Sequence, residues 1–95
     1  YVFYFIEAMQ QAARDMGLDD AQARALAVQT FVGAAQLAAG SPEPVAVLRE
    51  RVTSKGGTTA AALASLDACH VKGAIVQALH AANARAKELG DELDR

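Results

Sequence analysis

The sequence predicts an all-α protein, a bundle of about five helices. Apolar residues recur with helical spacing through most of the 95 residues. No segment shows the alternation of apolar and polar residues that is typical of a half-buried strand. Glycine and proline interrupt the helical pattern at only a few places, and these interruptions give the expected ends of the helices.

The first two helices are expected on either side of Gly17. The first carries an apolar stripe in steps of four and three residues, which consists of Val2, Ile6, Met9, Ala13 and Met16. Gly17 follows at the position of a C-terminal cap, and Asp19 or Asp20 can cap the next helix. The stripe of the second helix has the same spacing and consists of Ala21, Ala25, Val28, Val32, Ala35 and Ala39.

Three further helices are expected after the segment "GSPEP", residues 40–44, which ends the second helix because proline cannot continue it. Pro44 suits the first turn of a short third helix that runs to about Val52. A fourth helix begins at about Thr58 and a fifth near Val71. The fifth carries a seam with heptad spacing, which consists of Ile75, Leu79, Ala82, Ala86, Leu89 and Leu93.

Length and composition indicate one domain that associates with a second copy. A chain of 95 residues forms one domain at most. Hydrophobic residues make up 53% and charged residues 21%, which is more apolar than usual for a soluble domain. The stripes can pack within one chain as an antiparallel bundle, or across a two-fold axis as a dimer. The surplus of apolar residues favours the dimer.

Several classes of function and location are disfavoured. The net charge of −2 and the lack of a basic patch argue against nucleic acid, and the longest apolar run is too short to span a membrane. Cys69 is the single cysteine, which fits a cytoplasmic protein. It has no partner at metal-ligand spacing beyond the adjacent His70, so no metal site is expected. Because the chain opens on Tyr1 within a helical pattern, we expect it to be part of a longer protein.

The segment "VTSKGGTT", residues 52–59, has the composition of an anion-binding turn. Gly56 and Gly57 allow unusual backbone angles and close approach of a ligand. The first amides of the helix that follows lack partners within the helix, and the helix dipole adds positive potential there. Ser54, Thr58 and Thr59 supply hydroxyls that can donate and accept hydrogen bonds. The segment could therefore hold a carboxylate or a phosphate.

This segment has three alternative interpretations: a phosphate loop, a dinucleotide fingerprint, and an ordinary turn with a helix cap. The common phosphate loop has lysine after its last glycine, whereas Lys55 precedes both glycines. No strand leads into the segment, which excludes the dinucleotide fingerprint. Glycine and threonine between two helices can also form an ordinary turn and cap without any ligand.

The segment "LRERVTSKGGTTAAALASLD", residues 48–67, resembles the signature of the pyrroline-5-carboxylate reductase family. The matching positions are Leu48, Val52, Thr53, Ser54, Gly56, Gly57, Thr59, Leu63, Leu66 and Asp67. "YVFYFIEAMQQAARDMGL", "AVQTFVGAAQL" and "ANARAKELG" also resemble family segments, so the likeness spans nearly the whole chain. The family usually has proline in place of Lys55, and a glycine-rich, aromatic turn in place of "ACHVKG".

The resemblance implies a two-domain reductase that uses NADPH or NADH to convert 1-pyrroline-5-carboxylate to L-proline, the last step of proline biosynthesis. Residues 1–95 would be its C-terminal helical domain, which intertwines with a second copy as a homodimer or part of a larger homo-oligomer. The N-terminal dinucleotide-binding domain is absent from the chain, so no residue here is expected to bind the cofactor. We therefore expect the chain alone to assemble but to lack reductase activity.

The resemblance also assigns roles in the turn. The backbone N–H groups near Ser54, Gly56, Gly57 and Thr58 would hold the substrate carboxylate, and the catalytic Thr59 hydroxyl would hydrogen-bond the ring nitrogen. The imine either arrives protonated or receives its proton through Thr59 or water. The alternative to a reductase is a free-standing helical dimerisation or adaptor module without catalysis.

Overall fold

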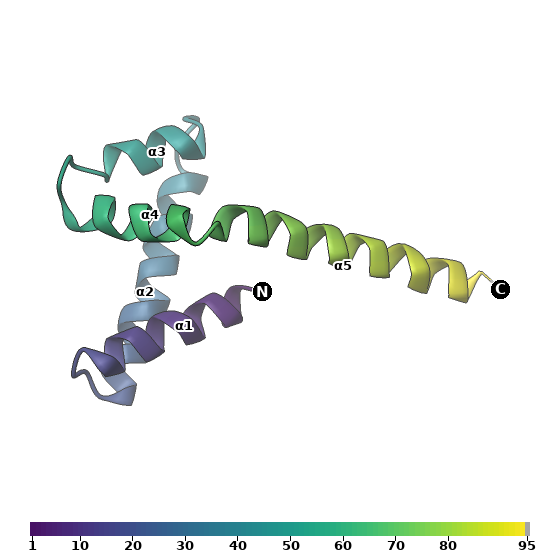
Figure 1. Cartoon of the computed structure of the whole chain (residues 1–95), viewed down its shortest axis with the longest axis horizontal. Coiled ribbons are helices and arrows are strands. Elements are labelled where there is room, and N and C mark those ends of the chain that lie inside the picture. Colours follow the sequence, from purple (N-terminus) through teal and green to yellow (C-terminus); the bar gives the residue numbers. More distant parts are fainter. Residues whose placement is uncertain (95) are drawn as a thin grey trace. The chain divides into compact units, whose positions relative to one another are not determined.

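The computed structural model describes residues 1–94, which form five α-helices and no strand (Figure 1). The helices are α1 (Val2–Asp15), α2 (Asp20–Ala39), α3 (Val45–Arg51), α4 (Thr58–Ala68) and α5 (Val71–Leu93). This confirms the predicted all-α class and the number of helices. The chain divides into two compact units, Tyr1–Leu48 and the residues from Arg49 onward, and each is described separately.

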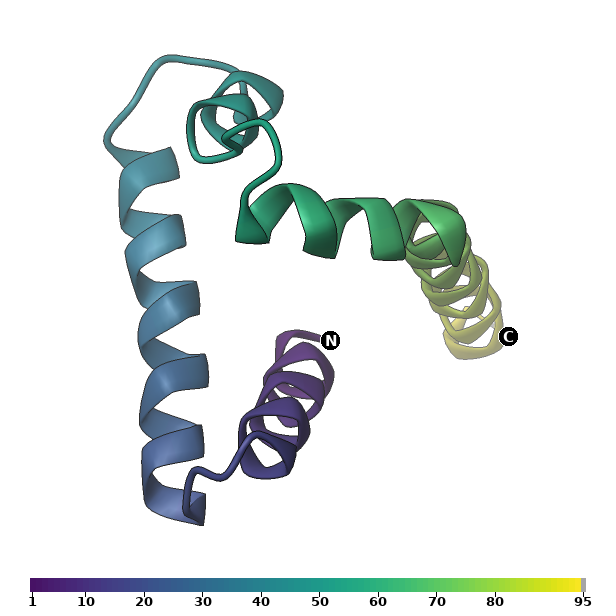
Figure 2. The ribbon, with the colours of Figure 1, turned by 60° about the vertical axis from the view of Figure 1, so that its left-hand side comes forward.

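The first unit is built on a hairpin of α1 and α2, which lie side by side and are joined by a short loop (Figure 2). Its buried residues are all alanines, Ala13 on α1 and Ala23 and Ala27 on α2. Small side chains at these positions let the two helix backbones approach closely. The contact therefore depends on backbone proximity more than on large apolar side chains.

The turn between α1 and α2 is fixed by hydrogen bonds at both helix ends. The Gly17 N–H donates to the Arg14 carbonyl at 2.9 Å, and the Leu18 N–H donates to the Ala13 carbonyl at 3.1 Å. This pair of bonds, with Gly17 at φ 104°, is a Schellman motif. The structure thus confirms that Gly17 forms the predicted C-terminal cap.

Asp19 begins α2 through a capping box. Its carboxylate accepts a hydrogen bond from the Gln22 N–H at 2.8 Å, and the Gln22 side-chain oxygen accepts one from the Asp19 N–H at 3.2 Å. Two amides at the helix start are thereby paired. Of the two predicted caps, Asp19 is the one that the structure uses.

The face of α2 that packs on α1 differs from the stripe predicted for this helix. Ala23 and Ala27 are buried, whereas Ala21 and Ala25 are exposed. At about 100° per residue, the buried face is rotated by roughly 140° from the predicted stripe. The stripe of α1 is confirmed over its three middle positions, because Ile6 and Met9 are half-buried and Ala13 is buried. Val2 and Met16, at its ends, are 52% and 75% exposed.

The short helix α3 follows the proline segment. The Pro44 carbonyl accepts hydrogen bonds from the Val47 and Leu48 N–H groups at 3.0 and 3.2 Å. Pro44 therefore lies at the cap, one position before the first helical turn to which it was assigned. The helix ends at Arg51, one residue before the predicted Val52.

In the second unit, α4 and α5 are joined at His70. This residue has left-handed backbone angles, φ 55° and ψ 37°, and its N–H donates to the Asp67 carbonyl at 3.1 Å. Both helices begin where the sequence placed them, at Thr58 and Val71. No helix among the described residues is long and apolar enough to cross a membrane.

The predicted seam of α5 is mostly exposed in the single chain. Ile75 and Ala82 are half-buried, whereas Leu79, Leu89 and Leu93 are 48%, 44% and 87% exposed. The seam therefore keeps much of its apolar surface available for contacts outside the second unit.

Candidate functional site

The segment between α3 and α4 forms a tight turn over Ser54–Gly57. The Gly57 N–H donates to the Ser54 carbonyl at 3.0 Å, which closes a β-turn with Lys55 and Gly56 at its centre. Gly56 has φ 74°, and Lys55 is not among the described residues with positive φ. These angles indicate a type II turn, which requires positive φ at its third residue and therefore favours glycine there.

The turn leads directly into α4, with Gly57 as the N-cap. Gly57 is extended, at φ −86° and ψ −178°, and its carbonyl accepts a hydrogen bond from the Ala61 N–H at 3.1 Å. Glycine offers no side-chain acceptor to the amides of the first helical turn. Among the described residues, the N–H groups of Thr58, Thr59 and Ala60 have no hydrogen-bond partner. They are the unpaired donors that the sequence predicted at this point.

Ser54 contributes its hydroxyl to the same place. A Cβ atom added at Gly57 would collide with the Ser54 Oγ atom, so the hydroxyl lies directly against the Gly57 backbone. The absence of a side chain at Gly57 is what allows this approach. A hydroxyl and a row of free amides are thereby brought together at one helix end.

Exposure and charge at the turn suit an anionic ligand. Thr58 is exposed, and Thr59 is half-buried. The first turn of α4 contains no acidic residue, and the nearest acids along the chain are Glu50 and Asp67. A carboxylate placed at the free amides would meet the positive end of the helix dipole without a neighbouring acid in the turn to repel it.

The segment thus brings together the five predicted site residues, Ser54, Gly56, Gly57, Thr58 and Thr59, over one turn and one helix start. It is not part of a continuous helix. The Gly57 N–H, which was expected to bind the carboxylate, is instead bonded to the Ser54 carbonyl, whereas the N–H groups of Thr58 and Thr59 are unpaired. Thr53 lies outside the group, because its hydroxyl donates to the Arg49 carbonyl at 2.6 Å at the end of α3. Its role here is to terminate α3.

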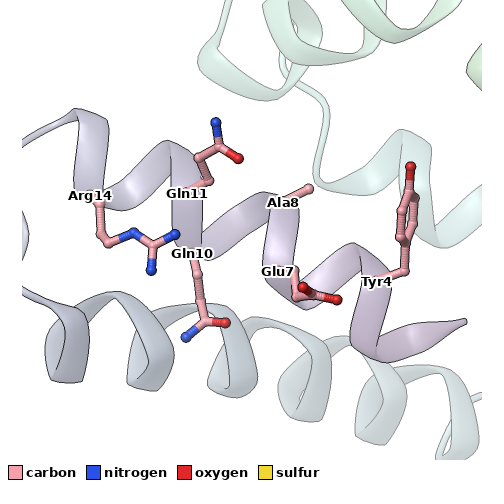
Figure 3. A pocket seen from close by; sticks show the side chains of 6 residues that line it. All are labelled: Tyr4, Glu7, Ala8, Gln10, Gln11 and Arg14. Atoms are coloured by element: carbon pink, nitrogen blue, oxygen red, sulfur yellow. The ribbon is translucent and has the colours of Figure 1, made fainter.

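A separate hollow of about 410 Å³ lies along α1 in the first unit (Figure 3). Its lining consists of Tyr4, Glu7, Ala8, Gln10, Gln11 and Arg14. All six residues come from one helix, and none of the predicted site residues is among them. The side chains fan out along the helix instead of converging on one point. No sequence pattern predicts a hollow here, because polar residues on one helix face ordinarily form a solvated surface.

Neither Cys69 nor His70 forms part of a metal site. Cys69 is exposed, and no group of three or more metal-ligating side chains occurs within residues 1–94.

Comparison with known proteins shows the family to which the chain belongs. Residues 1–89 match the family model described as pyrroline-5-carboxylate reductase dimerisation. The chain belongs to this family. The resemblance seen in the sequence is thereby confirmed.

Relatives of the chain carry the name pyrroline-5-carboxylate reductase. The protein from Haemophilus influenzae is 47% identical over 90 residues, which cover 94% of this chain and 33% of the relative. The protein from Pseudomonas aeruginosa is 43% identical over 93 residues, which cover 98% of this chain and 34% of the relative. The chain thus spans about a third of the length of these reductases.

Solved structures of pyrroline-5-carboxylate reductases share the fold. The enzyme from Coxiella burnetii superposes with a TM-score of 0.87 at 43% identity, over 94% of this chain and 33% of that one. The enzyme from Plasmodium falciparum, solved with NADP bound, superposes with a TM-score of 0.82 at 33% identity, over 85% of this chain and 32% of that one. At these sequence identities, the two enzymes resemble this chain in sequence as well as in the arrangement of the helices.

Proposed function

We propose that this chain is the C-terminal, dimer-forming and substrate-binding part of a pyrroline-5-carboxylate reductase, which reduces 1-pyrroline-5-carboxylate to L-proline. The observation that carries the proposal is the turn at 54–59 in a chain of this family, where the Ser54 hydroxyl lies against Gly57, three unpaired amides begin α4, and Thr59 is the second residue of that helix. The substrate is a carboxylate with a ring nitrogen close by. The turn offers backbone amides as donors for the carboxylate and a hydroxyl for the ring nitrogen.

In this proposal the chain orients the substrate. The amides of Thr58 and its neighbours hold the carboxylate, because unpaired N–H groups at a helix start bind anions well. The Thr59 hydroxyl hydrogen-bonds the ring nitrogen. Fixing both groups restricts the imine carbon to one position, and alignment of this kind lowers the barrier to a bimolecular step. The imine proton is either present on arrival or passes through Thr59 or water.

The hydride donor, NADPH or NADH, would be held by another part of the full-length protein. Within residues 1–94 there is no strand followed by a glycine-rich loop and a helix, which is how a dinucleotide is ordinarily bound. The described residues therefore do not fit a nicotinamide cofactor, and their part in the reaction is to bind and position the substrate. The chain alone is accordingly proposed to lack reductase activity.

The assembly proposed for the protein is a homodimer or a larger homo-oligomer. The exposed seam of α5 and the exposed apolar residues of α2, such as Leu26 and Leu37 at 55% and 66%, need a cover. The family to which the chain belongs is a dimerisation family. A second copy, presenting the same surfaces, satisfies both observations. Neither nucleic acid nor a membrane is proposed as a partner, and the cytoplasm is the proposed location.

The proposal is tested by replacing Thr59 in the full-length protein. Loss of a hydrogen bond to a charged group costs about 1.5–3 kcal/mol, so Thr59→Ala should lower kcat for 1-pyrroline-5-carboxylate roughly 10- to 100-fold. Thr59→Ser keeps the hydroxyl and should retain most of the turnover. Oxidation of the reduced nicotinamide cofactor, followed by absorbance, is the measurement.

Ser65→Ala is the matched control, because Ser65 is an exposed hydroxyl residue further along α4. It should leave kcat unchanged. An unchanged rate in Thr59→Ala would remove Thr59 from the mechanism. A full-length protein that assembles but never reduces the substrate would favour the alternative of a dimerisation or adaptor module.

A further inference from the structure

Lys55 occupies the exposed corner of the turn that leads into α4. It is the second residue of the type II turn, between Ser54 and Gly56, and its side chain is exposed. Among the described residues it forms no ion pair. Its positive charge is therefore not neutralised by a neighbour.

The turn keeps this charge close to the free amides. The hydrogen bond from Gly57 to Ser54 closes the turn, and the ends of a β-turn lie within about 7 Å of each other. Lys55 is one residue from Ser54 and two from Gly57, and its ammonium sits on a flexible four-carbon stem. A charge at this place lies within about one Debye length, roughly 8 Å at physiological salt, of an anion bound at the start of α4.

The charges of the surrounding sequence reinforce the effect. Residues 52–66 contain no acid, although the chain as a whole has a net charge of −2. Arg49 and Arg51 lie in the last turn of α3, with Glu50 between them. The turn is therefore a locally positive region in a chain of slightly negative charge, and Lys55 is the charged residue within the turn itself.

We infer that Lys55 attracts the substrate carboxylate to the amides at the start of α4. This inference rests on the proposed function. Because the ammonium is exposed and flexible, it acts on the capture of the anion and not on the hydride step. Its effect therefore falls on KM, is screened by salt, and leaves kcat unchanged.

The test measures KM and kcat of the full-length protein at about 0.01 M and about 1 M salt, where the Debye length changes from roughly 30 Å to 3 Å. Lys55→Gln removes the charge and keeps the length of the side chain. At low salt it should raise KM for 1-pyrroline-5-carboxylate about two- to fivefold, the range expected for an exposed charge pair. At high salt its KM should equal that of the wild type, and Lys55→Arg should behave as the wild type throughout.

Lys72→Gln is the matched control, since Lys72 is an exposed lysine in the first turn of α5 and its replacement changes the net charge equally. Its KM should not change at either salt concentration. The inference is overturned if Lys55→Gln has the KM of the wild type at low salt, if Lys72→Gln raises KM as much, or if Lys55→Gln lowers kcat instead. A wild-type protein without turnover would overturn the proposed function itself, which separates the two failures.

Discussion

Gly56 and Gly57 are adjacent, but the structure requires each for a different reason. Gly56 has φ 74°, a left-handed angle that residues with a Cβ atom adopt at a cost. Gly57 has φ −86°, which any residue can adopt, but a Cβ there would meet the Ser54 Oγ atom. One glycine sets the direction of the chain, and the other makes room for a hydroxyl beside the free amides.

Replacing Gly56 should therefore destabilise the protein through the backbone. Gly56→Ala is expected to lower the free energy of unfolding by about 1–2 kcal/mol, because the alanine must adopt the left-handed angle. No heavy atom lies within 4 Å of the position where the new Cβ would be, so a clash does not contribute. The measurement is chemical denaturation of the full-length protein followed by circular dichroism.

Gly73→Ala provides the opposite case in the same unit. Gly73 lies inside α5, and apart from its chain neighbours and the nearby backbone of α5, no heavy atom lies within 4 Å of its added Cβ. At about 100° per residue it faces away from the seam, so this substitution should raise stability by roughly 0.5–1 kcal/mol. A Gly56→Ala protein as stable as the wild type would contradict the type II turn described here.

The ends of the helices depend on a few neighbouring residues. Asp19 and Gln22 pair through both side chains and backbones at the start of α2, and Gly17 closes α1 two residues earlier. Such caps satisfy amides and carbonyls that the helix itself leaves unpaired. The α1–α2 hairpin therefore has a turn whose geometry is specified locally.

The cap of α2 can be tested alone. Asp19→Ala removes the acceptor for the Gln22 N–H and should lower the free energy of unfolding by about 0.5–2 kcal/mol. Asp19→Asn keeps a side-chain oxygen and should retain most of the stability. The midpoint of denaturation in urea reports both changes. Equal midpoints for Asp19→Ala and the wild type would show that the capping box contributes nothing to stability.

The difference between local and tertiary signals explains which features the sequence predicted. The boundaries at Gly17, Asp19, Thr58 and Val71 follow from neighbouring residues, and the structure confirms them. The packed face of α2 depends on which partner each face meets. Alanines occur on several faces of α2, so the spacing of apolar residues alone did not single out Ala23 and Ala27 as the buried ones.

The features of the candidate site also fall into those that the local sequence predicts and those that it does not. The free amides and the double glycine follow from the local sequence, whereas the position of the Ser54 hydroxyl against Gly57 depends on the geometry of the turn. The left-handed backbone of His70 was not predictable, because histidine at a helix end carries no local signal for that angle. The roles proposed for Ser54, Gly56, Gly57, Thr58 and Thr59 came from the family resemblance and stay predictions.

Most of the large apolar side chains in the molecule are not buried by the chain itself. Within residues 1–94, only three residues are buried, and all three are alanines. Large apolar residues on α2 and α5 are exposed, including Leu37 at 66% and Leu79 at 48%. A domain with so small a core has little hydrophobic stabilisation of its own. Folding and assembly are therefore expected to be coupled.

The seam of α5 gives the sharpest test of assembly. Leu79→Glu places a charge in the middle of this seam and removes an apolar contact that is worth about 1.5–3 kcal/mol when fully buried. Because a two-fold interface contains each residue twice, the dissociation constant of the dimer should rise by at least about tenfold, which corresponds to 1.4 kcal/mol. Sedimentation velocity over a range of protein concentrations measures the shift.

Gln77→Glu adds the same carboxylate on the face of α5 opposite the seam, where Gln77 is exposed, and should leave the dissociation constant unchanged. If Leu79→Glu assembles as tightly as Gln77→Glu, the α5 seam is not the surface that joins the two copies, and the exposed residues of α2 become the surface to test next.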